Sequence, residues 1–345
     1  MTSTPQPLDF RSDTVTRPDE TMRRAMAAAE VGDNVLDADP TIAELERRAA
    51  RVLGMPAALW TPTGTMANLI ALTAHLRRGD RFLAMRGAHV LHNELGSAAW
   101  LAGGMPEPLE HDAGPGRPTA EALERAIGTV GPYFTLRTSL LCLENTHNSA
   151  GGAVTPPDEH ARLLAVARQA GLKVHLDGAR IWHAAVALGV PPAALTVGVD
   201  TVSACFSKGL GAPVGSVVAG TPEFVELARR TRQMLGGGVR QGGVLAAAGL
   251  VALDRVDELA ESHENARRLA AGLAEHGWSV PAPETNIVLA EVPDVPAATK
   301  SLASLGILAY PLPERVRFVL HRDLSAADVE ETLYRIKTSR AKPGS

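Results

Sequence analysis

Short apolar runs alternate with longer amphipathic stretches through most of this chain. Between residues 57 and 219, the longer stretches carry apolar residues at every third or fourth position. Short apolar runs are typical of buried strands, and the three-to-four spacing is typical of helices packed on a sheet. The alternation predicts an α/β domain with a mostly parallel sheet. The expected strands are 57–60, 81–85, 139–143, 173–176, 201–206 and 215–219.

The expected helices extend on both sides of this region. The residues 203–208 and 215–218 are too close for a crossover helix, so we expect these two strands to be antiparallel. The expected helices are 21–29, 41–53, 67–76, 120–127, 158–170, 179–188, 222–235 and 244–253, then a long helix 256–276. A βαβ-like tail follows, with strands at 286–292 and 316–320 and helices at 297–305 and 325–339.

This pattern divides the chain into three parts. We expect an N-terminal arm at 1–20, a large α/β domain at 21–254 and a small α+β domain at 255–345. The long helix would connect the two domains.

Composition narrows the class of protein. The 345 residues are 45% hydrophobic, which is enough for a sizeable core, and 34 basic and 38 acidic residues give a net charge of −4. This balance gives no reason to expect nucleic acid as a partner. The two cysteines, Cys142 and Cys205, fall in expected strands and are interpreted as buried thiols. With no signal-peptide pattern and no membrane-length apolar run, we expect a soluble cytoplasmic protein.

Asp177 and Lys208 each close an apolar run, where ligands bind in open parallel sheets. A carboxylate can keep a pyridinium nitrogen protonated, and a lysine amine can form an imine with an aldehyde. The pair therefore suggests a site for pyridoxal 5'-phosphate. Taken singly, Asp177 also suits a helix N-cap, and Lys208 also suits a lysine extending from the sheet edge to solvent.

The segment 62–68 follows a strand and opens a helix. The amides of Gly64, Thr65 and Met66, with a threonine hydroxyl, would form an anion site at the helix N-terminus. A plain helix cap explains the same residues equally well. The anion site becomes persuasive only beside the lysine and the aspartate.

Two histidines also follow expected strands. His89, with Glu94 five residues later, and His147 are candidates for a base or for stacking on an aromatic ring. His175 lies within a strand and is interpreted as a core residue. Because the histidines lack the usual zinc spacing, we expect no catalytic metal.

Taken together, these motifs resemble the low-specificity L-threonine aldolases, in the β-eliminating-lyase group of fold-type-I pyridoxal-phosphate enzymes. The resemblance implies a large domain with a mostly parallel seven-stranded sheet and a small α+β C-terminal domain. It also implies retro-aldol cleavage of L-threonine, L-allo-threonine and related L-β-hydroxy-α-amino acids to glycine and an aldehyde. The matching stretches are 10–18, 31–41, 62–69, 143–148, 175–180, 207–216 and 236–242.

The resemblance also implies roles for the residues at the cofactor. Lys208 would bind the cofactor aldehyde covalently, and Asp177 would pair with the pyridine nitrogen. Gly64 and Thr65 would hold the phosphate, and Arg240 would reach the phosphate of a neighbouring subunit.

Other residues would meet the ring and the substrate. His89 would stack on the ring, and Arg180 would lie beside the pyridine hydroxyl. Lys208, His89 and His147 form the expected catalytic set, in which His89, His147 or an ordered water is the base. The expected substrate-binding set is Ser12, Arg180, Arg317 and Glu94.

The resemblance further implies a homotetramer with active sites shared between subunits. One position departs from the family, since Leu36 stands where a tyrosine is common, and this puts the side-chain preference in question. Another pyridoxal-phosphate reaction, such as β-elimination, racemisation or transamination, and a non-catalytic amino-acid sensor are the alternatives.

Overall fold

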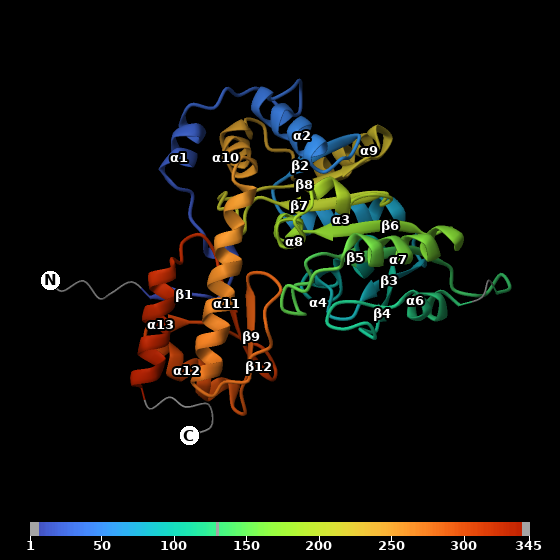
Figure 1. Ribbon diagram of the computed structural model, residues 1–345. Coiled ribbons are helices and arrows are strands. Elements are labelled where there is room, and N and C mark those ends of the chain that lie inside the picture. Colours follow the sequence, from blue (N-terminus) through green and yellow to red (C-terminus); the bar gives the residue numbers. More distant parts are fainter. Residues whose placement is uncertain (1–6, 129–130, 340–345) are drawn as a thin grey trace.

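A seven-stranded sheet forms the centre of the protein in the computed structural model, which describes residues 7–128 and 131–339 (Figure 1). Its order is β2-β8-β7-β6-β5-β3-β4, and only β2–β8 and β8–β7 pair antiparallel. The strands are β2 (Ala57–Thr61), β3 (Arg81–Met85), β4 (Met105–Leu109), β5 (Thr138–Glu144), β6 (Lys173–Gly178), β7 (Thr201–Cys205) and β8 (Ser216–Gly220). The mostly parallel sheet and the antiparallel pairing of β7 with β8 are confirmed.

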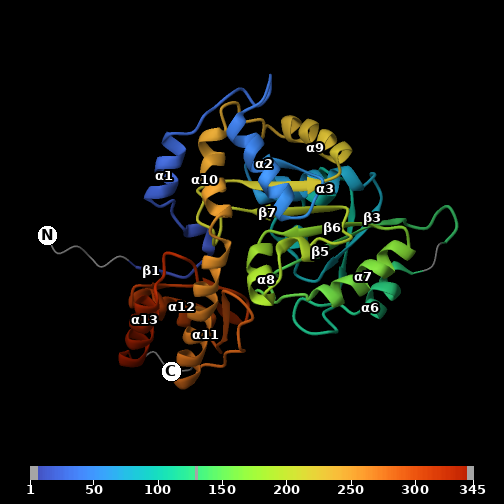
Figure 2. The same cartoon turned by 45° about the horizontal axis from the view of Figure 1, so that its top comes forward.

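Helices cover both faces of the sheet (Figures 1 and 2). Because neighbouring strand residues point to opposite faces, Leu59 packs with Ala67 of α3 and Val225 of α9, whereas Trp60 belongs to the larger core with Ile42 of α2. The helices of this domain are α1 (Glu20–Ala27), α2 (Pro40–Val52), α3 (Gly64–His75), α4 (His89–His92), α5 (Ser97–Trp100), α6 (Ala120–Ile127), α7 (Pro157–Gln169), α8 (Ile181–Leu188), α9 (Pro222–Met234) and α10 (Gly243–Leu253).

Strand β4 was not among the six strands expected from the pattern. Its sequence, Met-Pro-Glu-Pro-Leu, contains two prolines and is partly exposed, so it lacks the signature of a buried strand. The structure places β4 at the edge of the sheet, where β3 is its only partner among the described residues. Pro106 and Pro108 lie two residues apart, so both nitrogens face the free edge, where no ladder hydrogen bond is needed.

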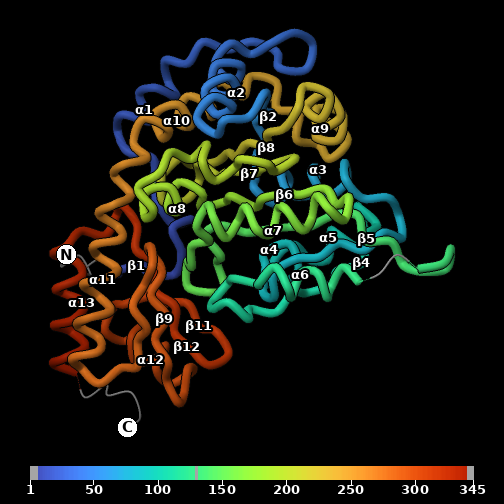
Figure 3. The backbone as a smooth tube through the Cα atoms, turned by 45° about the vertical axis from the view of Figure 1, so that its right-hand side comes forward, coloured from blue at the N-terminus to red at the C-terminus, as the bar shows by residue number. Residues whose placement is uncertain are grey.

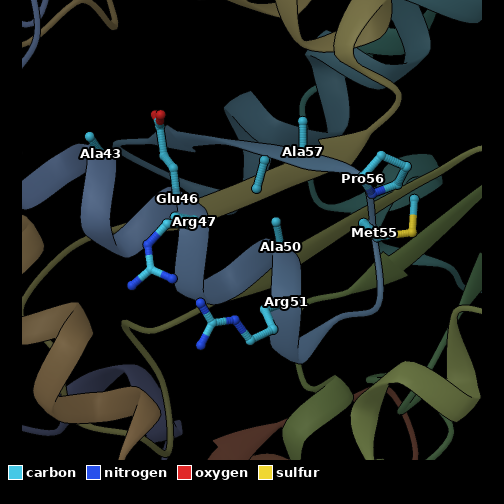
Figure 4. A pocket seen from close by; sticks show the side chains of 9 residues that line it. Ala43, Glu46, Arg47, Ala50, Arg51, Met55, Pro56 and Ala57 are labelled. Carbon is cyan, nitrogen blue, oxygen red and sulfur yellow. The ribbon is translucent and has the colours of Figure 1, made fainter.

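The opposite edge of the sheet, β2, is protected by side chains. Glu46 of α2 accepts a hydrogen bond from the Trp60 amide at 2.8 Å, and the buried Arg232 of α9 donates to the Trp60 carbonyl at 2.8 Å. These contacts satisfy backbone groups that an edge strand would otherwise expose. A shallow hollow of about 470 Å³ lies beside this edge, lined by residues of α2 and of the chain entering β2 (Figure 4).

The C-terminal part has its own core. Three antiparallel strands, β9 (Ile287–Glu291), β12 (Arg315–Val319) and β11 (Tyr310–Pro311), form a sheet in the order β11-β12-β9. The helices α12 (Val295–Ser304) and α13 (Ala326–Thr338) belong to this part. The βαβ-like prediction is wrong, because a parallel pair was implied. The chain after α12 turns through β11, which pairs antiparallel with β12, so β12 meets β9 in the opposite direction.

The N-terminal arm belongs to this second core. Strand β1 (Leu8–Asp9) pairs with β10 (Ile307–Leu308), and Phe10 is buried against Phe318. The predicted boundaries 1–20, 21–254 and 255–345 remain predictions, and residues 1–6 and 340–345 lie outside the described residues. The arm thus packs against the small C-terminal core before the chain enters the large domain.

Helix α11 (Leu259–Glu275) connects the two parts (Figure 3). Leu259 at its start packs in the core of the large domain, whereas Ala266, Leu269 and Leu273 pack in the small core. The first residues of the expected long helix, 256–258, form a 3-10 turn before α11 begins. Within residues 7–128 and 131–339, no helix has the length and apolar character needed to span a bilayer.

Candidate active site

Polar side chains gather at the carboxyl ends of the parallel strands. Asp177 is the fifth residue of β6, and Lys208 follows β7 by three residues. His89 begins α4 just after β3, and Glu144 ends β5. Parallel strands end at a common edge, so residues far apart in sequence meet there.

Asp177 is buried and held by two donors. Its Oδ1 accepts from the Ala179 amide at 3.0 Å, and its Oδ2 accepts from the Asn68 side-chain amide at 2.8 Å. Burial opposes ionisation, but the nearby His89 and Lys208 and the Ala179 amide bring the pKa of Asp177 below its ordinary value. The helix-cap interpretation is wrong, because α8 begins at Ile181 with Arg180 at its N-cap position and no side-chain cap, and Ala179 precedes the helix. An ionised carboxylate here suits a protonated ring nitrogen.

Lys208 lies in a short loop between β7 and β8 that is fixed by its backbone. Its carbonyl accepts hydrogen bonds from the Thr16 hydroxyl at 2.9 Å and from the Gly211 amide at 2.8 Å. The side chain is partly buried. Burial acts to raise the pKa of both Asp177 and Asp13, but nearby positive charges lower them. Lys208 contributes to this lowering, after His89 at Asp177 and after Arg180 at Asp13. Lys208 therefore lies close enough to Asp177 and Asp13 to interact electrostatically with both.

Helix α3 begins at Gly64, earlier than expected. Thr63 is the N-cap, and its hydroxyl accepts from the Met66 amide at 3.1 Å. The Met66 amide is therefore engaged by the cap, and the prediction that it serves an anion stays a prediction. The first-turn amides of Gly64 and Thr65 have no intrahelical acceptor. A Cβ on Gly64 would lie 2.7 Å from Cys205 Sγ, so only glycine lets the helix start sit against β7.

His89 is oriented by Glu94. The His89 Nδ1 lies 2.8 Å from Glu94 Oε1, and the His89 amide donates to Glu144 Oε2 at 2.7 Å. Burial opposes protonation, but Glu94 and Asp177 raise the pKa of His89. Burial also raises the pKa of Glu94. Glu94 was expected to bind substrate, which remains a prediction, since its described contacts are with His89 and Asn68.

Donor atoms of His89, Glu94 and Asp177 lie within 4.8 Å of one another, a grouping that could hold a cation. Hydrogen bonds within the protein explain the same grouping. The Asn68 amide donates to both carboxylates at 2.8 Å, and Glu94 meets His89. The expectation of no catalytic metal stays a prediction.

Arg180 forms a buried ion pair that the sequence did not reveal. Its Nε and Nη2 donate to the two Asp13 carboxylate oxygens at 2.7 and 2.6 Å. Burial opposes ionisation of Asp13, but Arg180 brings its pKa far below the ordinary value. Asp13 lies within the matching stretch 10–18, but only its neighbour Ser12 was expected at the site.

Arg317 is brought to Arg180 by the small domain. Its Nη2 donates to Asn148 Oδ1 at 3.2 Å, and Arg180 Nη1 donates to the same oxygen at 2.9 Å. Burial, with repulsion from Arg180, lowers the pKa of Arg317 to about 10. The buried Arg317 Nε has no partner among the described residues. A carboxylate would satisfy this donor.

Ser12 lies at the start of the same arm turn as Asp13. Its hydroxyl oxygen accepts from the Thr14 amide at 3.2 Å and meets the Thr14 hydroxyl at 2.8 Å. The side chain is partly exposed. Its role toward a substrate carboxylate remains a prediction.

His147 is buried after β5. Its Nδ1 accepts from the Ala150 amide at 3.3 Å, and its ring packs edge-on against His111 at a centroid distance of 5.1 Å. Its Nε2 has no partner among the described residues. The neighbour Asn148, which joins Arg180 and Arg317, is the residue of this segment that meets the arginines. The base role of His147 stays a prediction.

Arg240 and Leu36 share one exposed surface. Arg240 Nη1 lies 3.2 Å from Asp33 Oδ2, and Asp33 Oδ1 accepts from the Leu36 amide at 3.0 Å. The Leu36 side chain is 77% exposed. The described side-chain contacts of Arg240 are with Asp33, and its role at a neighbouring subunit stays a prediction.

Comparisons with known proteins agree with this arrangement. The Beta-eliminating lyase family matches residues 9–294. A probable low-specificity L-threonine aldolase 2 of Arabidopsis thaliana is 43% identical, covering 94% of this chain and 95% of the relative. The low specificity L-threonine aldolase of Escherichia coli K12 is 40% identical, covering 94% and 96%.

Solved structures share the fold. A threonine aldolase of Leishmania major has a TM-score of 0.83 at 20% identity, covering 96% of this chain and 99% of its own. A serine palmitoyltransferase of Sphingomonas wittichii has a TM-score of 0.76 at 20% identity, covering 96% and 86%. The predicted fold class is thus confirmed. The chain belongs to the beta-eliminating lyase family and, within it, to the low-specificity L-threonine aldolases.

Proposed function

We propose that this protein cleaves L-threonine and related L-β-hydroxy-α-amino acids to glycine and an aldehyde, with pyridoxal 5'-phosphate as cofactor. Relatives named L-threonine aldolases support the reaction. The observation that carries the proposal is the meeting of Asp177 and Lys208 at one sheet edge, with Arg317 brought toward Arg180 by the small domain. Acetaldehyde would be the product from threonine.

The residues present fit the cofactor. The buried and ionised Asp177 suits the pyridine nitrogen, Lys208 supplies an amine, and the first-turn amides of Gly64 and Thr65 suit the phosphate. When bound, this cofactor accepts electrons from the bond that breaks. The protein's part is to bind, orient and transfer protons around it.

Arg317 is the main donor for the substrate carboxylate in this proposal. Arg180 is already neutralised by Asp13, whereas the buried Nε of Arg317 has no described acceptor. Ser12 and Arg180 add donors on the arm side. Holding the carboxylate fixes the amino acid at the sheet edge where His89 also lies.

His89 is the first candidate to take the proton from the β-hydroxyl. Its Nδ1 is engaged by Glu94, which leaves Nε2 as the nitrogen available for proton transfer. The raised pKa makes its neutral form a stronger base. His147 and an ordered water remain the alternatives.

We also propose a homotetramer that shares active sites and works in the cytoplasm. Large apolar side chains are exposed near the edge strand β4, including Leu95, Trp100 and Met105, and they suit burial against another copy. Arg240 and Leu36, which lie next to α9 and α2 beside the opposite edge strand β2, would act across a separate contact between copies. Both cysteines are buried and unpaired, which fits a reducing compartment. Light scattering coupled to size exclusion would measure the assembly.

The first experiment incubates the purified protein and cofactor with L-threonine, L-allo-threonine and phenylserine. Glycine and the matching aldehyde should appear in equal amounts. A 2-oxo acid with ammonia would show β-elimination instead, and a change of stereochemistry alone would show racemisation. Either result would refute the proposed cleavage.

Two variants link the activity to the site. Lys208→Ala should abolish the visible absorption band of the bound cofactor together with turnover. Arg317→Ala should raise KM roughly 100-fold, because truncating one partner of a buried charge pair costs several kcal/mol. Arg315→Ala is the matched control, since Arg315 lies on the same strand but is only half-buried and faces Glu291. An equal effect of both arginine variants would contradict the assignment.

A further inference from the structure

The buried side-chain amide of Asn68 makes hydrogen bonds to both Asp177 and Glu94 of the candidate site. Asn68 lies in the second turn of α3 and is 2% exposed. Its Nδ2 lies 2.8 Å from Asp177 Oδ2 and 2.8 Å from Glu94 Oε1. Its Oδ1 lies 2.8 Å from the Ser203 hydroxyl and 3.1 Å from His175 Nε2. Both hydrogens and both lone pairs of the amide are therefore used.

The partners fix the orientation of this amide. Two carboxylates accept hydrogen bonds, so the nitrogen must face Asp177 and Glu94, and the oxygen must face Ser203 and His175. Ser203 and His175 are then donors. His175 lies two residues before Asp177, so both face α3, and the interpretation of His175 as a plain core residue was incomplete.

The donor-to-acceptor direction of these hydrogen bonds also holds for the residues behind His175. With its Nε2 donating, a neutral His175 accepts at Nδ1 from the Thr201 hydroxyl at 2.9 Å. Burial lowers the pKa of His175 to about 4, which keeps the ring neutral. Thr201 Oγ1 in turn lies 3.0 Å from His75 Nε2, which must donate. A directed chain of hydrogen bonds therefore runs from His75 through Thr201 and His175 to Asn68.

Asn68 stabilises two carboxylates that lie close together in the buried site. Asp177 and Glu94 are both buried and close enough for Asp177 to raise the pKa of Glu94. Two carboxylates in one buried site disfavour joint ionisation unless each receives a donor. One nitrogen with two hydrogens supplies both donors while holding the carboxylates at fixed separation.

We propose that Asn68 is a positioning residue that keeps Asp177 ready for the ring nitrogen and, through Glu94, holds His89 over the ring. This inference rests on the proposed cofactor. The charged and titratable groups around Asp177 are Lys208 from the loop after β7, His89 and Glu94 from α4 and the chain after it, Cys142 from β5, and His175 from its own strand. Ser203 and His175 orient the amide.

The main test is the pH dependence of cofactor binding. Pyridoxal 5'-phosphate is titrated into the apoprotein from pH 3.5 to 9, and the dissociation constant is read from quenching of intrinsic fluorescence. Asn68→Leu removes both donors in a side chain of similar volume. Asp177 should then ionise at higher pH, so the acid limb of binding should move up by about one pH unit. Affinity at pH 8 should fall about tenfold.

Asn265→Leu is the matched control. Asn265 is a buried asparagine of α11 whose amide donates to the Leu324 carbonyl at 3.2 Å, away from the site. It should leave the acid limb unchanged, whatever it does to stability. An Asn68→Leu protein with weaker binding but a wild-type acid limb would overturn the proposal, because a structural defect lowers affinity at every pH.

A second measurement needs no cofactor. Nitrogen NMR of histidine-labelled apoprotein should show His175 as the neutral Nε2–H tautomer, and this state should be lost in Asn68→Leu. An Nδ1–H tautomer in the wild type would overturn the inferred orientation of the amide. Failure of the wild type to bind pyridoxal 5'-phosphate would instead contradict the proposed function, while the tautomer would still decide how Asn68 is arranged.

Discussion

The buried ion pair between Asp13 and Arg180 attaches the N-terminal arm to the large domain, and its contribution to the free energy of unfolding can be measured. The two side chains are 0% and 5% exposed and share two hydrogen bonds of 2.6 and 2.7 Å. Asp13→Ala would remove both acceptors and leave the Arg180 charge buried, close to the cationic Arg317. Breaking a buried pair from one side costs about 3–5 kcal/mol. We expect the free energy of unfolding to fall by about that amount.

Denaturant unfolding of the apoprotein at pH 7 would measure this loss. Glu20→Ala is the control, because Glu20 pairs with Arg24 on an exposed helix surface at 2.9 Å and such pairs contribute about 0.3–0.5 kcal/mol. The double variant Asp13→Ala/Arg180→Met should be more stable than Asp13→Ala alone, since no uncompensated charge remains. If Asp13→Ala costs no more than Glu20→Ala, the reasoning is refuted.

The pH dependence of the same pair has a definite sign. Arg180 brings the folded-state pKa of Asp13 far below the unfolded value, even though burial opposes this. The stabilisation is therefore fully present above the unfolded pKa of about 3.9 and is lost as pH falls toward the folded pKa. The stability difference between wild type and Asp13→Asn should shrink below about pH 4. A constant difference down to the lowest pH would contradict this.

Two further predictions concern the cofactor cradle and the base. Gly64→Ala should weaken cofactor binding about tenfold, because its Cβ would lie 2.7 Å from Cys205 Sγ and displace the start of α3. Gly64→Ala/Cys205→Ala should recover affinity, and equal loss in both would refute the steric cause. Glu94→Gln should move the acid limb of kcat/KM to lower pH, since Glu94 raises the pKa of His89, which must be neutral to act as base. An unmoved limb would favour His147 or water.

The local sequence pattern was sufficient to predict the strands that consist of a continuous apolar run. The buried strands from β2 to β8 were expected near their observed bounds, with the exception of β4. There, Pro106 and Pro108 removed the signature, and pairing with β3 alone made the segment a strand. The direction of β12 was also decided by pairing, because β11 turns the chain back before β12 joins β9.

The sequence by itself determined the strand ends and the residues they carry, so it was enough to predict a cofactor site from Asp177 and Lys208. Which side chains complete that site was decided by the tertiary structure. Asn68 meets Asp177 across 109 residues, Arg180 meets Asp13 across 167, and Arg317 meets Asn148 across 169. Strand periodicity arises from neighbours in the chain, whereas the ionisation and orientation of buried groups depend on partners that only packing brings within hydrogen-bond distance.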